Sequence, residues 1–488
     1  MIKTISEVAE GRKQRYLVIK SMRTPLKLTK SFESHFQLQL EGFLRDQGAL
    51  PEDESLDSKR FLSRSIIPHI RRLSDLFNRL DSPEHAHTPE AGKNVGLDQY
   101  WQKGSNPQNL RLAYMTNFMP TNAFRVASIV QELSRRGFFQ SKAAERFHTE
   151  DKIRVLELGA GPGSGSCGVA LGLSSALDSS NTQTKKPLIE WTLVEQSKSL
   201  LDWGENWLER YASSLGFTQS TVKGFCKKID PTKPFLPKEA RRFDVIVSSF
   251  FLNELAGTPE ILAKRINELV THHLTDNGIF ILCEPALMQQ SRRLLEIRQL
   301  WIENHSKQAK SQVLLPCLGH QACGSLTLKD DWCHEEVSWW RPPYLRIIDQ
   351  LTGFDRKTLD FSYLVFIRSP NQIGEILTGL TGTSEKRFRY ISPVKSAGPD
   401  YEGFICGQSG KSNCRIKKSL FETSTDAKAA TIEAAQILEA MPKKNETEQA
   451  PEEDAPFFKK DTRPTPERGD LLEEVELRGD PACKRASR

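Results

Sequence analysis

The stretch VLELGAGPGSGS, residues 155–166, decides the fold of this chain. It ends an apolar run typical of a buried β-strand and precedes a small-residue segment, residues 167–177, that can continue as a helix. Gly159, Gly161 and Gly163 let the backbone take positive φ and approach a ligand without a Cβ in the way. The free N–H groups at the start of the helix would face the same ligand. The stretch therefore predicts a nucleotide-cofactor loop between a strand and a helix.

Residue type and spacing distinguish this loop from two other cofactor loops. It lacks the Lys-Ser/Thr pair that holds phosphates and Mg²⁺ in a P-loop, and it does not keep the third-glycine spacing of the dinucleotide fingerprint. The loop resembles the first motif of class I S-adenosylmethionine (SAM) methyltransferases, E/D-x-G-x-G-x-G. The resemblance implies that Glu157 faces the cationic methionine portion of the cofactor and that the glycines lie under its adenosine. A glycine-rich βα turn of another α/β domain is the alternative.

The segments that follow fit a doubly wound α/β fold. Three further apolar runs are predicted strands: residues 189–196, 241–255 (the strand with its following loop) and 277–286. Two helical stretches separate them, residues 200–215 and 258–274. This alternation predicts a parallel sheet with crossover helices, the class I SAM-methyltransferase (Rossmann-like) architecture. Glu195 ends the second strand, where a carboxylate can accept both ribose hydroxyl protons.

Cysteines are concentrated in a second region. Three of the 9 cysteines, Cys317, Cys323 and Cys333, fall in one loop with His320 and His334 interleaved. Cys406 follows later in the chain. The acidic surroundings of the loop differ from a core, and the odd cysteine count and lack of a secretory segment disfavour disulfides, so we expect metal binding.

The spacing leaves the metal open. C-x5-C-x9-C lacks the paired C-x2-C knuckles of zinc ribbons, although a Cys₃His zinc site using His320 or His334 fits the residue types. Four thiolates would instead suit an iron–sulfur cluster. Three other cysteines stand in apolar or neutral surroundings and are interpreted as buried small hydrophobes: Cys167, Cys226 and Cys283.

The order of these pieces resembles a family, the methyltransferase-like assembly factors of the mitochondrial small ribosomal subunit and their bacterial relatives. The pieces are the glycine loop, VSSFFLNEL, P-C-x2-H-x2-C, D-W-C-H, DFSYLVFIR and a lone cysteine, over roughly residues 110–420. The resemblance implies a class I methyltransferase fold, association with small-subunit rRNA during assembly, and a 4Fe-4S cluster. Its ligands would be Cys317, Cys323, Cys333 and Cys406.

This chain departs from the family pattern in two places. It has Cys-Leu-Gly-His where the family commonly has Cys-Pro-His, and Glu-Glu follows Trp-Cys-His in place of an aromatic residue. The fourth ligand is also open, because Cys414 lies close to Cys406 in the sequence.

The stretch SSFFLNEL, residues 248–255, carries no recognisable catalytic motif. A base N-methyltransferase places Asn-Pro-Pro-aromatic here, and a cytosine-C5 enzyme needs a thiolate beside the loop. The polar candidates for a catalytic role are Ser248, Asn253 and Glu254. Asn-Glu is equally explained as a helix cap and a first-turn acid, so SAM binding is better supported than methyl transfer.

Charge and organisation suggest the partner. The net charge is +6, and basic clusters occur at residues 58–73, 386–390 and 411–418. Such clusters neutralise phosphates, although a solvated helix face explains the first equally well. No apolar run is long enough to span a membrane. We expect a cytoplasmic protein, with the mitochondrial matrix as the alternative, because the basic first thirty residues also carry acids.

We therefore expect four regions: a helical N-terminal region (1–110), a SAM-methyltransferase-like domain (111–305), a cysteine-rich iron–sulfur module (306–422) and a largely disordered tail (423–488), the last from its Lys, Glu and Pro content. The favoured hypothesis is a SAM-binding, iron–sulfur-containing methyltransferase-like protein acting on the small ribosomal subunit or its rRNA, with no membrane or DNA partner. One alternative is a ribosome assembly factor that performs no chemistry. The other is a small-molecule methyltransferase with a zinc-stabilised lid.

Overall fold

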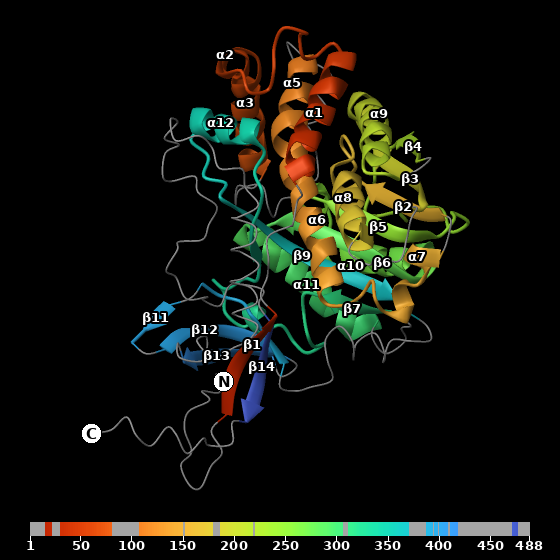
Figure 1. The fold of residues 1–488 in the computed structure, drawn as a ribbon. Helices are drawn as coiled ribbons and strands as arrows, with labels where there is room; N and C mark the ends of the chain where they lie inside the picture. Colours follow the sequence, from red (N-terminus) through yellow and green to blue (C-terminus); the bar gives the residue numbers. More distant parts are fainter. Residues whose placement is uncertain are drawn as a thin grey trace, which may run out of the picture. The chain divides into compact units, whose positions relative to one another are not determined.

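The computed structural model describes residues 15–21, 30–80, 107–149, 152–178, 186–217, 220–305, 311–369, 387–393, 395–398, 400–407, 410–417 and 471–476. The chain forms two compact units (Figure 1). The larger unit contains residues 25–317 and 325–383, and the smaller unit contains residues 1–24, 318–324 and 384–488.

A mixed eight-stranded sheet is the centre of the larger unit. Its strands are β2 (Lys152–Leu158), β3 (Leu188–Glu195), β4 (Thr221–Cys226), β5 (Phe243–Ser249), β6 (Leu274–Pro285), β7 (Ser311–Leu315), β8 (Glu335–Ser338) and β9 (Thr358–Arg368). The order is β4-β3-β2-β5-β6-β9-β7, and β8 also pairs with β9. Strands β2 to β6 are parallel, as expected. Strand β9 is antiparallel to β6 and to its other neighbours, so the expectation of an all-parallel sheet is wrong at this edge.

Helices cover both faces of this sheet, which confirms the doubly wound α/β class. One core lies between the sheet and α6 (Met119–Arg135), α8 (Ser164–Asp178) and α9 (Lys198–Ser214). The other lies between the sheet and α10 (Pro259–Glu268) and α11 (Met288–His305). Successive strand residues enter opposite cores, as in Val155 and Leu156 of β2, because side chains alternate along a strand.

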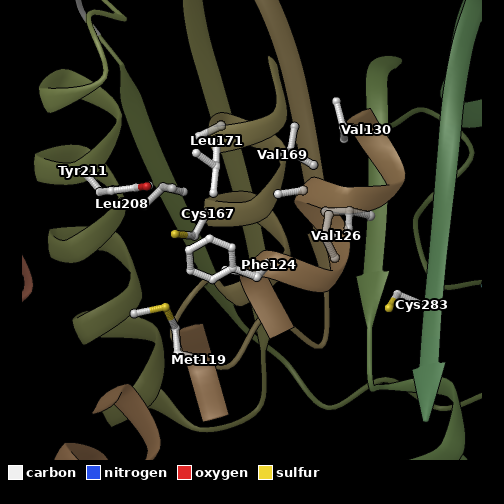
Figure 2. Packing of buried hydrophobic residues seen from close by; sticks show 14 of the residues in the cluster. Met119, Phe124, Val126, Val130, Cys167, Val169, Leu171, Leu208, Tyr211 and Cys283 are labelled. Atoms are coloured by element: carbon white, nitrogen blue, oxygen red, sulfur yellow. The ribbon is translucent and has the colours of Figure 1, made fainter. Parts of the chain in front are cut away.

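Close packing of α6 on α8 fixes the start of α8. A Cβ on Gly168 would overlap the Ala123 carbonyl, and one on Gly172 would overlap Val130. Figure 2 shows Val126 and Val130 on the side of α6 that faces α8. The loop before α8 is therefore held by a helix pair that tolerates no side chain at these two glycines.

The N-terminal helices pack into the same core. They are α1 (Lys30–Asp46), α2 (Lys59–Phe61), α3 (Ile67–Leu80) and α5 (Pro107–Ala113), with π-helical turns η1 (Leu62–Ile66) and η2 (Tyr114–Phe118). On α1, the Phe36 ring meets Trp207 of α9 edge-on at a centroid distance of 6.0 Å. In the region expected to be helical (1–110), residues 30–46, 59–80 and 107–110 are helical and belong to the larger unit. The expectation is wrong at residues 15–21, which form a strand, β1 (Arg15–Ser21), because they pair with a segment that is remote in sequence. The remaining short elements are η3 (Lys142–Ala144), α7 (Arg146–Thr149), η4 (Leu252–Glu254), η5 (Leu269–His273), η6 (Gly324–Leu326) and α12 (Pro343–Thr352).

An antiparallel six-stranded sheet forms the smaller unit. Its strands are β1 (Arg15–Ser21), β10 (Arg387–Tyr390), β11 (Lys395–Ala397), β12 (Asp400–Gly407), β13 (Gly410–Lys417) and β14 (Leu471–Glu476). Strand β14 pairs with both β1 and β10, so this part of the expected disordered tail is ordered by backbone pairing. The rest of that tail lies outside the described residues.

The expected boundary at residue 305 also needs correction. Strands β7, β8 and β9 come from the expected cysteine-rich module, yet they complete the sheet of the larger unit. Sequence order hides this, because β9 inserts between β6 and β7. No helix within the described ranges is long and apolar enough to cross a membrane.

Candidate cofactor pocket

A pocket of about 400 Å³ opens where parallel strands of the larger unit end. Its walls are the loops after β2, β3, β4 and β5, together with Phe77 of α3 and Tyr114 of η2. The carboxyl ends of parallel strands are the usual ligand-binding edge of an α/β sheet. The volume suits a nucleoside-sized ligand.

The glycine loop has the backbone that the sequence predicts. Gly159, Gly161 and Gly163 have φ of 66°, 53° and 79°, values that favour glycine. A Cβ on Gly159 would overlap the Phe251 ring, and one on Gly161 would lie 3.7 Å from the Tyr114 hydroxyl oxygen. Gly159 and Gly161 both line the pocket.

Glu157 lies behind this loop rather than in the pocket wall. Its side chain is buried, and its two oxygens accept hydrogen bonds from the backbone N–H groups of Gly165, at 2.7 Å, and Ser166, at 2.8 Å. Burial raises the pKa of this carboxyl to about 7. In this structure Glu157 holds the first turn of α8 against the strand end, which differs from the contact with the cofactor that the family motif implies.

Glu195 lies in the pocket wall at the end of β3. One oxygen accepts the N–H of Gly161 at 2.8 Å, and the other accepts the N–H of Ser197 at 2.8 Å. These two bonds fix the Glu195 carboxylate in the pocket wall. It also ties the glycine loop to the neighbouring strand.

Tyr114 is a pocket residue that the sequence reasoning missed. It starts the π-helical turn η2 and is enclosed near three carboxylates. Burial, and then Glu254, Glu195 and Glu157, raise its pKa far above the usual value, so the phenol stays protonated. The surrounding LAYMTNF has no sequence motif, although π-turns often occur at functional sites.

The loop after β5 is held from two sides. Buried Glu284 accepts the N–H groups of Leu252 and Asn253 at 2.9 and 3.1 Å. Arg293 of α11 donates to the carbonyl oxygens of Leu252, Leu255 and Gly257. The loop begins with Phe250 at φ 56°, a conformation that side chains rarely adopt. The Arg125 guanidinium lies 5.0 Å from the centre of that ring.

The structure separates the three candidate catalytic residues. Glu254 lines the pocket. Ser248 is buried and is not part of the pocket wall. Asn253 contributes to a much smaller cavity beside Glu284 and Arg293. Glu254 is therefore the one of the three that can reach a bound ligand.

The fourth wall, residues 227–232 after β4, was also missed. It contains Lys227, Lys228, Asp230 and Thr232. Asp230 accepts hydrogen bonds from the N–H and the hydroxyl of Thr232, which fixes the turn. The wall was missed because β4 itself was not predicted. TVKGFC gives no clear period-2 signal, because Val222 and Phe225 are three residues apart and so fall on opposite faces of the strand.

The cysteines fall into three environments. Cys167 and Cys283 are buried, as predicted, whereas Cys226 is exposed at the end of the edge strand β4, so that prediction is wrong. Cys317, Cys323, Cys333 and Cys406 are partly exposed thiols. Cys317 and Cys333 belong to the larger unit, and Cys323 and Cys406 belong to the smaller. Among the described residues, no three or more His, Cys, Asp or Glu side chains are grouped to hold a metal ion.

Cys414 differs from Cys406 despite their nearness in sequence. On the β12–β13 hairpin, Cys414 is opposite Gly403 and Cys406 is opposite Lys411. Because residues 403 and 406 of one strand point to opposite faces, the two thiols do too. Cys414 is buried, which raises its pKa to about 12. This thiol is a packing group, so Cys406 is the better match to a metal ligand.

Parts of all three predicted basic clusters can be placed, and in the third, residues 411–418, Lys411 is half-buried on β13. In the cluster at 58–73, the apolar side chains face the core and the basic ones lie outside, as on a solvated helix face. In the cluster at 386–390, Arg389 is buried, so it cannot contribute to a surface.

Strand order, the antiparallel β9 and the glycine loop fit the class I SAM-dependent methyltransferase fold. No protein-family model matches the chain, and no curated protein matches it. Solved structures similar to it include loganic acid methyltransferase with S-adenosylhomocysteine (SAH), at 11% identity and TM-score 0.29, covering 54% of this chain and 96% of that one. A TehB-like SAM-dependent methyltransferase from Corynebacterium glutamicum has 12% identity and TM-score 0.26, with coverage of 58% and 100%. A SAM-dependent methyltransferase from Geobacter sulfurreducens in complex with SAH has 12% identity and TM-score 0.26, with coverage of 51% and 97%.

Proposed function

We propose that this chain is a SAM-dependent methyltransferase. The observation that carries the proposal is the pocket in which Gly159, Gly161 and Glu195 meet at the carboxyl ends of β2 and β3. SAM, when bound, supplies a methyl group on a sulfonium ion, which an electron-rich acceptor atom can attack. The glycine loop would lie against the adenosine, and Glu195 would accept the ribose hydroxyls.

Glu254 is the residue we assign to the acceptor side. It lines the pocket on η4, within the electrostatic reach of Tyr114. A carboxylate there can take the proton that an amine or hydroxyl acceptor loses on methylation. The Tyr114 hydroxyl, which stays protonated, lies in the wall of the same pocket.

Calorimetry on ligand-free protein tests the cofactor part of this proposal. We expect heat of binding with SAM and with SAH. If neither compound binds at high concentration, the pocket does not serve this cofactor, whatever the fold. With binding established, Glu254→Gln should lower the methylation rate and leave the dissociation constant for SAH unchanged.

The proposed acceptor is RNA of the small ribosomal subunit, in the cytoplasm. The resemblance of the ordered motifs supports this choice, together with the basic sequence at residues 411–418. The test is co-sedimentation with small ribosomal subunits over a salt series, since phosphate contacts weaken as salt rises. Sedimentation that is absent at low salt would contradict the proposal.

A 4Fe-4S cluster held by Cys317, Cys323, Cys333 and Cys406 is the finer part of the proposal. It is supported by the family resemblance and by the donor chemistry, since all four are partly exposed thiols. Anaerobically purified protein should contain about four irons per chain. Cys406→Ser should lose iron, while Cys414→Ser, on the opposite face of the hairpin, should keep it. Zinc without iron would contradict the cluster.

A binding protein without methyl transfer is a second candidate function. It is favoured by the placement of Ser248 and Asn253 outside the pocket, which leaves Glu254 as the one predicted catalytic candidate in its wall. This function would be favoured if the protein binds SAM and if Glu254→Gln leaves ribosome assembly in cells at the wild-type level.

A further inference from the structure

Strand β4 presents one uncovered face at the edge of the larger unit's sheet. Val222 and Gly224 turn toward α9, where Glu205 accepts the Gly224 N–H at 2.6 Å. Lys223 and Phe225 point the other way, because side chains alternate along a strand. The Phe225 ring is 45% exposed, and the Lys223 ammonium lies 5.2 Å from its centre.

Basic residues are concentrated in the sequence of this strand and the segment that follows it. Residues 221–242 contain seven basic and two acidic residues, a net charge of +5 in a chain whose total is +6. Nearby, three cations share one carboxylate, Glu190 of β3. They are Lys152 at 2.8 Å, Arg154 at 3.5 Å and Arg241 at 2.9 Å. These three cations pull the pKa of Glu190 below its usual value. Their charge exceeds what Glu190 neutralises.

The cations and the ring lie on the same face of the sheet. Glu190 is in register with Thr221, and Thr192 is in register with Lys223. Arg241 connects these two register positions, since it donates hydrogen bonds to both Glu190 and Thr192. We call the set Lys152, Arg154, Lys223, Phe225 and Arg241 the basic strip.

The basic strip leads to the cofactor pocket. Beyond Phe225 the chain continues to Lys227 and Lys228, which line the pocket. The backbone of Lys227 still follows the ladder, because its N–H donates to the Glu195 carbonyl at 2.8 Å. At about 3.3 Å per residue, the path from residue 221 to residue 227 is roughly 20 Å. A linear anion lying on the strip would therefore reach the pocket mouth with its end or one of its side groups.

We propose that the basic strip binds a single-stranded segment of RNA and leads it toward the pocket. Phosphates would contact Lys152, Arg154, Lys223 and Arg241, and one base would stack on Phe225. Basic grooves with exposed aromatic rings bind single strands in this way, because every base has a face to stack. The inference rests on the proposed function in one respect, the choice of RNA as methyl acceptor.

Lysine on an edge strand has another explanation. It can prevent edge-to-edge aggregation, and then Phe225 would have no part in binding. An acidic protein surface would pair with the cations but would give no role to the exposed ring of Phe225. The combination of an exposed ring with cations on the same face is what selects a nucleic acid.

Fluorescence anisotropy with a short labelled oligouridylate, at a series of salt concentrations, tests the proposal on the full chain. Lys223→Gln/Arg241→Gln removes two cations. We expect the slope of log affinity against log salt to become shallower by about 1.4, at about 0.7 per phosphate contact. Phe225→Ala should weaken binding about tenfold with the slope unchanged, and Phe225→Trp should restore it.

Lys59→Gln/Arg60→Gln is the matched control. It removes the same charge from α2, whose Lys59 and Arg60 are exposed in the larger unit. We expect it to keep the wild-type slope. Because Arg241 also bonds to β3, Lys223→Gln alone serves as a variant with less risk to folding, with an expected change of about 0.7.

The outcomes separate this proposal from the proposed function. Equal slopes for the strip and control variants would overturn the strip, as would self-association of the Lys223 variants with unchanged RNA binding, which would identify edge protection. If calorimetry shows SAM binding but the protein does not bind RNA, the basic strip proposal fails and the methyltransferase proposal stands. If RNA binds with the expected salt slopes but SAM does not bind, the methyltransferase proposal fails and the basic strip proposal stands. Lys223→Gln and Phe225→Ala should leave SAM binding unchanged, since neither residue lines the pocket.

Discussion

The glycine loop after β2 and the loop after β5 line the same pocket and share one anchoring device. Each is held by a buried glutamate near a strand end, Glu157 on β2 and Glu284 on β6. Each glutamate accepts hydrogen bonds from two consecutive backbone N–H groups. Burial raises the pKa of both carboxyls to about 7. The same physical solution therefore supports both walls.

The two loops differ in what shapes the backbone above the anchor. Three glycines shape the first loop, and they leave room for a ligand. The second contains a phenylalanine at positive φ, a costly conformation that surrounding contacts must maintain. Arg293 supplies three of those contacts from α11. The conformation of the glycine loop is thus set by its own residues, whereas that of the loop after β5 is maintained by contacts from residues distant in sequence.

The largest effect should follow from filling the space that the glycine loop keeps open. We expect Gly161→Leu to abolish SAM binding in calorimetry, because the side chain would enter the pocket at a position where φ is 53°. Gly353→Leu is the control. Its φ is 81° with open space around the Cβ position, so it carries the backbone cost without touching the pocket. Equal loss of binding in both variants would show that backbone strain, not occupied space, is responsible.

The same difference explains what the sequence could predict of the site. Gly159, Gly161 and Gly163 were predictable, because positive φ and close approach restrict the residue type locally. Glu195 lies in the pocket wall because it ends a strand that is recognisable in the sequence. Tyr114 and Arg293 were not predictable, because their positions depend on how α11 and η2 pack against the sheet. Glu157 was identified but assigned to the ligand, as its hydrogen bonds to α8 cannot be read from the motif.

The fold divides in a similar way. Strands β2, β3, β5 and β6 are buried on both faces and read as apolar runs. Strand β4 was missed because one face is exposed and carries Lys223 and Phe225. The direction of β9 was missed because apolar content does not indicate strand polarity. Strand β14 was missed because LLEEVE is short and isolated in a polar segment, and its pairing partners are remote in sequence.

A smaller effect should follow from removing the distant anchor of the second loop. Arg293→Met would leave three carbonyls without their donor and Glu284 without a nearby cation. We expect the free energy of unfolding to fall by about 3 kcal/mol, because hydrogen bonds made by a charged group contribute about 1.5–3 kcal/mol. The dissociation constant for SAM should rise about tenfold, since this loop is one pocket wall.

Arg292→Met provides the matched control for this prediction. Arg292 also donates to three carbonyls, but those belong to Ser325, Leu328 and Asp331. Its loss should reduce the stability to unfolding while SAM binding remains at the wild-type value. A similar weakening of SAM binding in both variants would mean that Arg293 acts through general stability rather than through the loop.

The last prediction concerns the pH dependence of stability, which compares the two anchoring glutamates, Glu157 and Glu284, directly. The folded-state pKa of Glu284 is raised from 4.5 to about 7, so between these values the folded protein binds more protons than the unfolded chain. Its contribution to stability is therefore fully present below about pH 4.5 and is lost as pH rises through about pH 7. At about 1.4 kcal/mol per pH unit, this loss is at most about 3 kcal/mol.

Glu284→Gln should remove this pH-dependent loss. The free energy of unfolding of the variant in urea, relative to that of the wild type, should therefore increase as pH rises through this window. Glu157→Gln should behave alike, because its pKa and its two hydrogen bonds are equivalent. Curves that run parallel to the wild type across the window for Glu284→Gln but diverge for Glu157→Gln would show that the two anchors are not the same device.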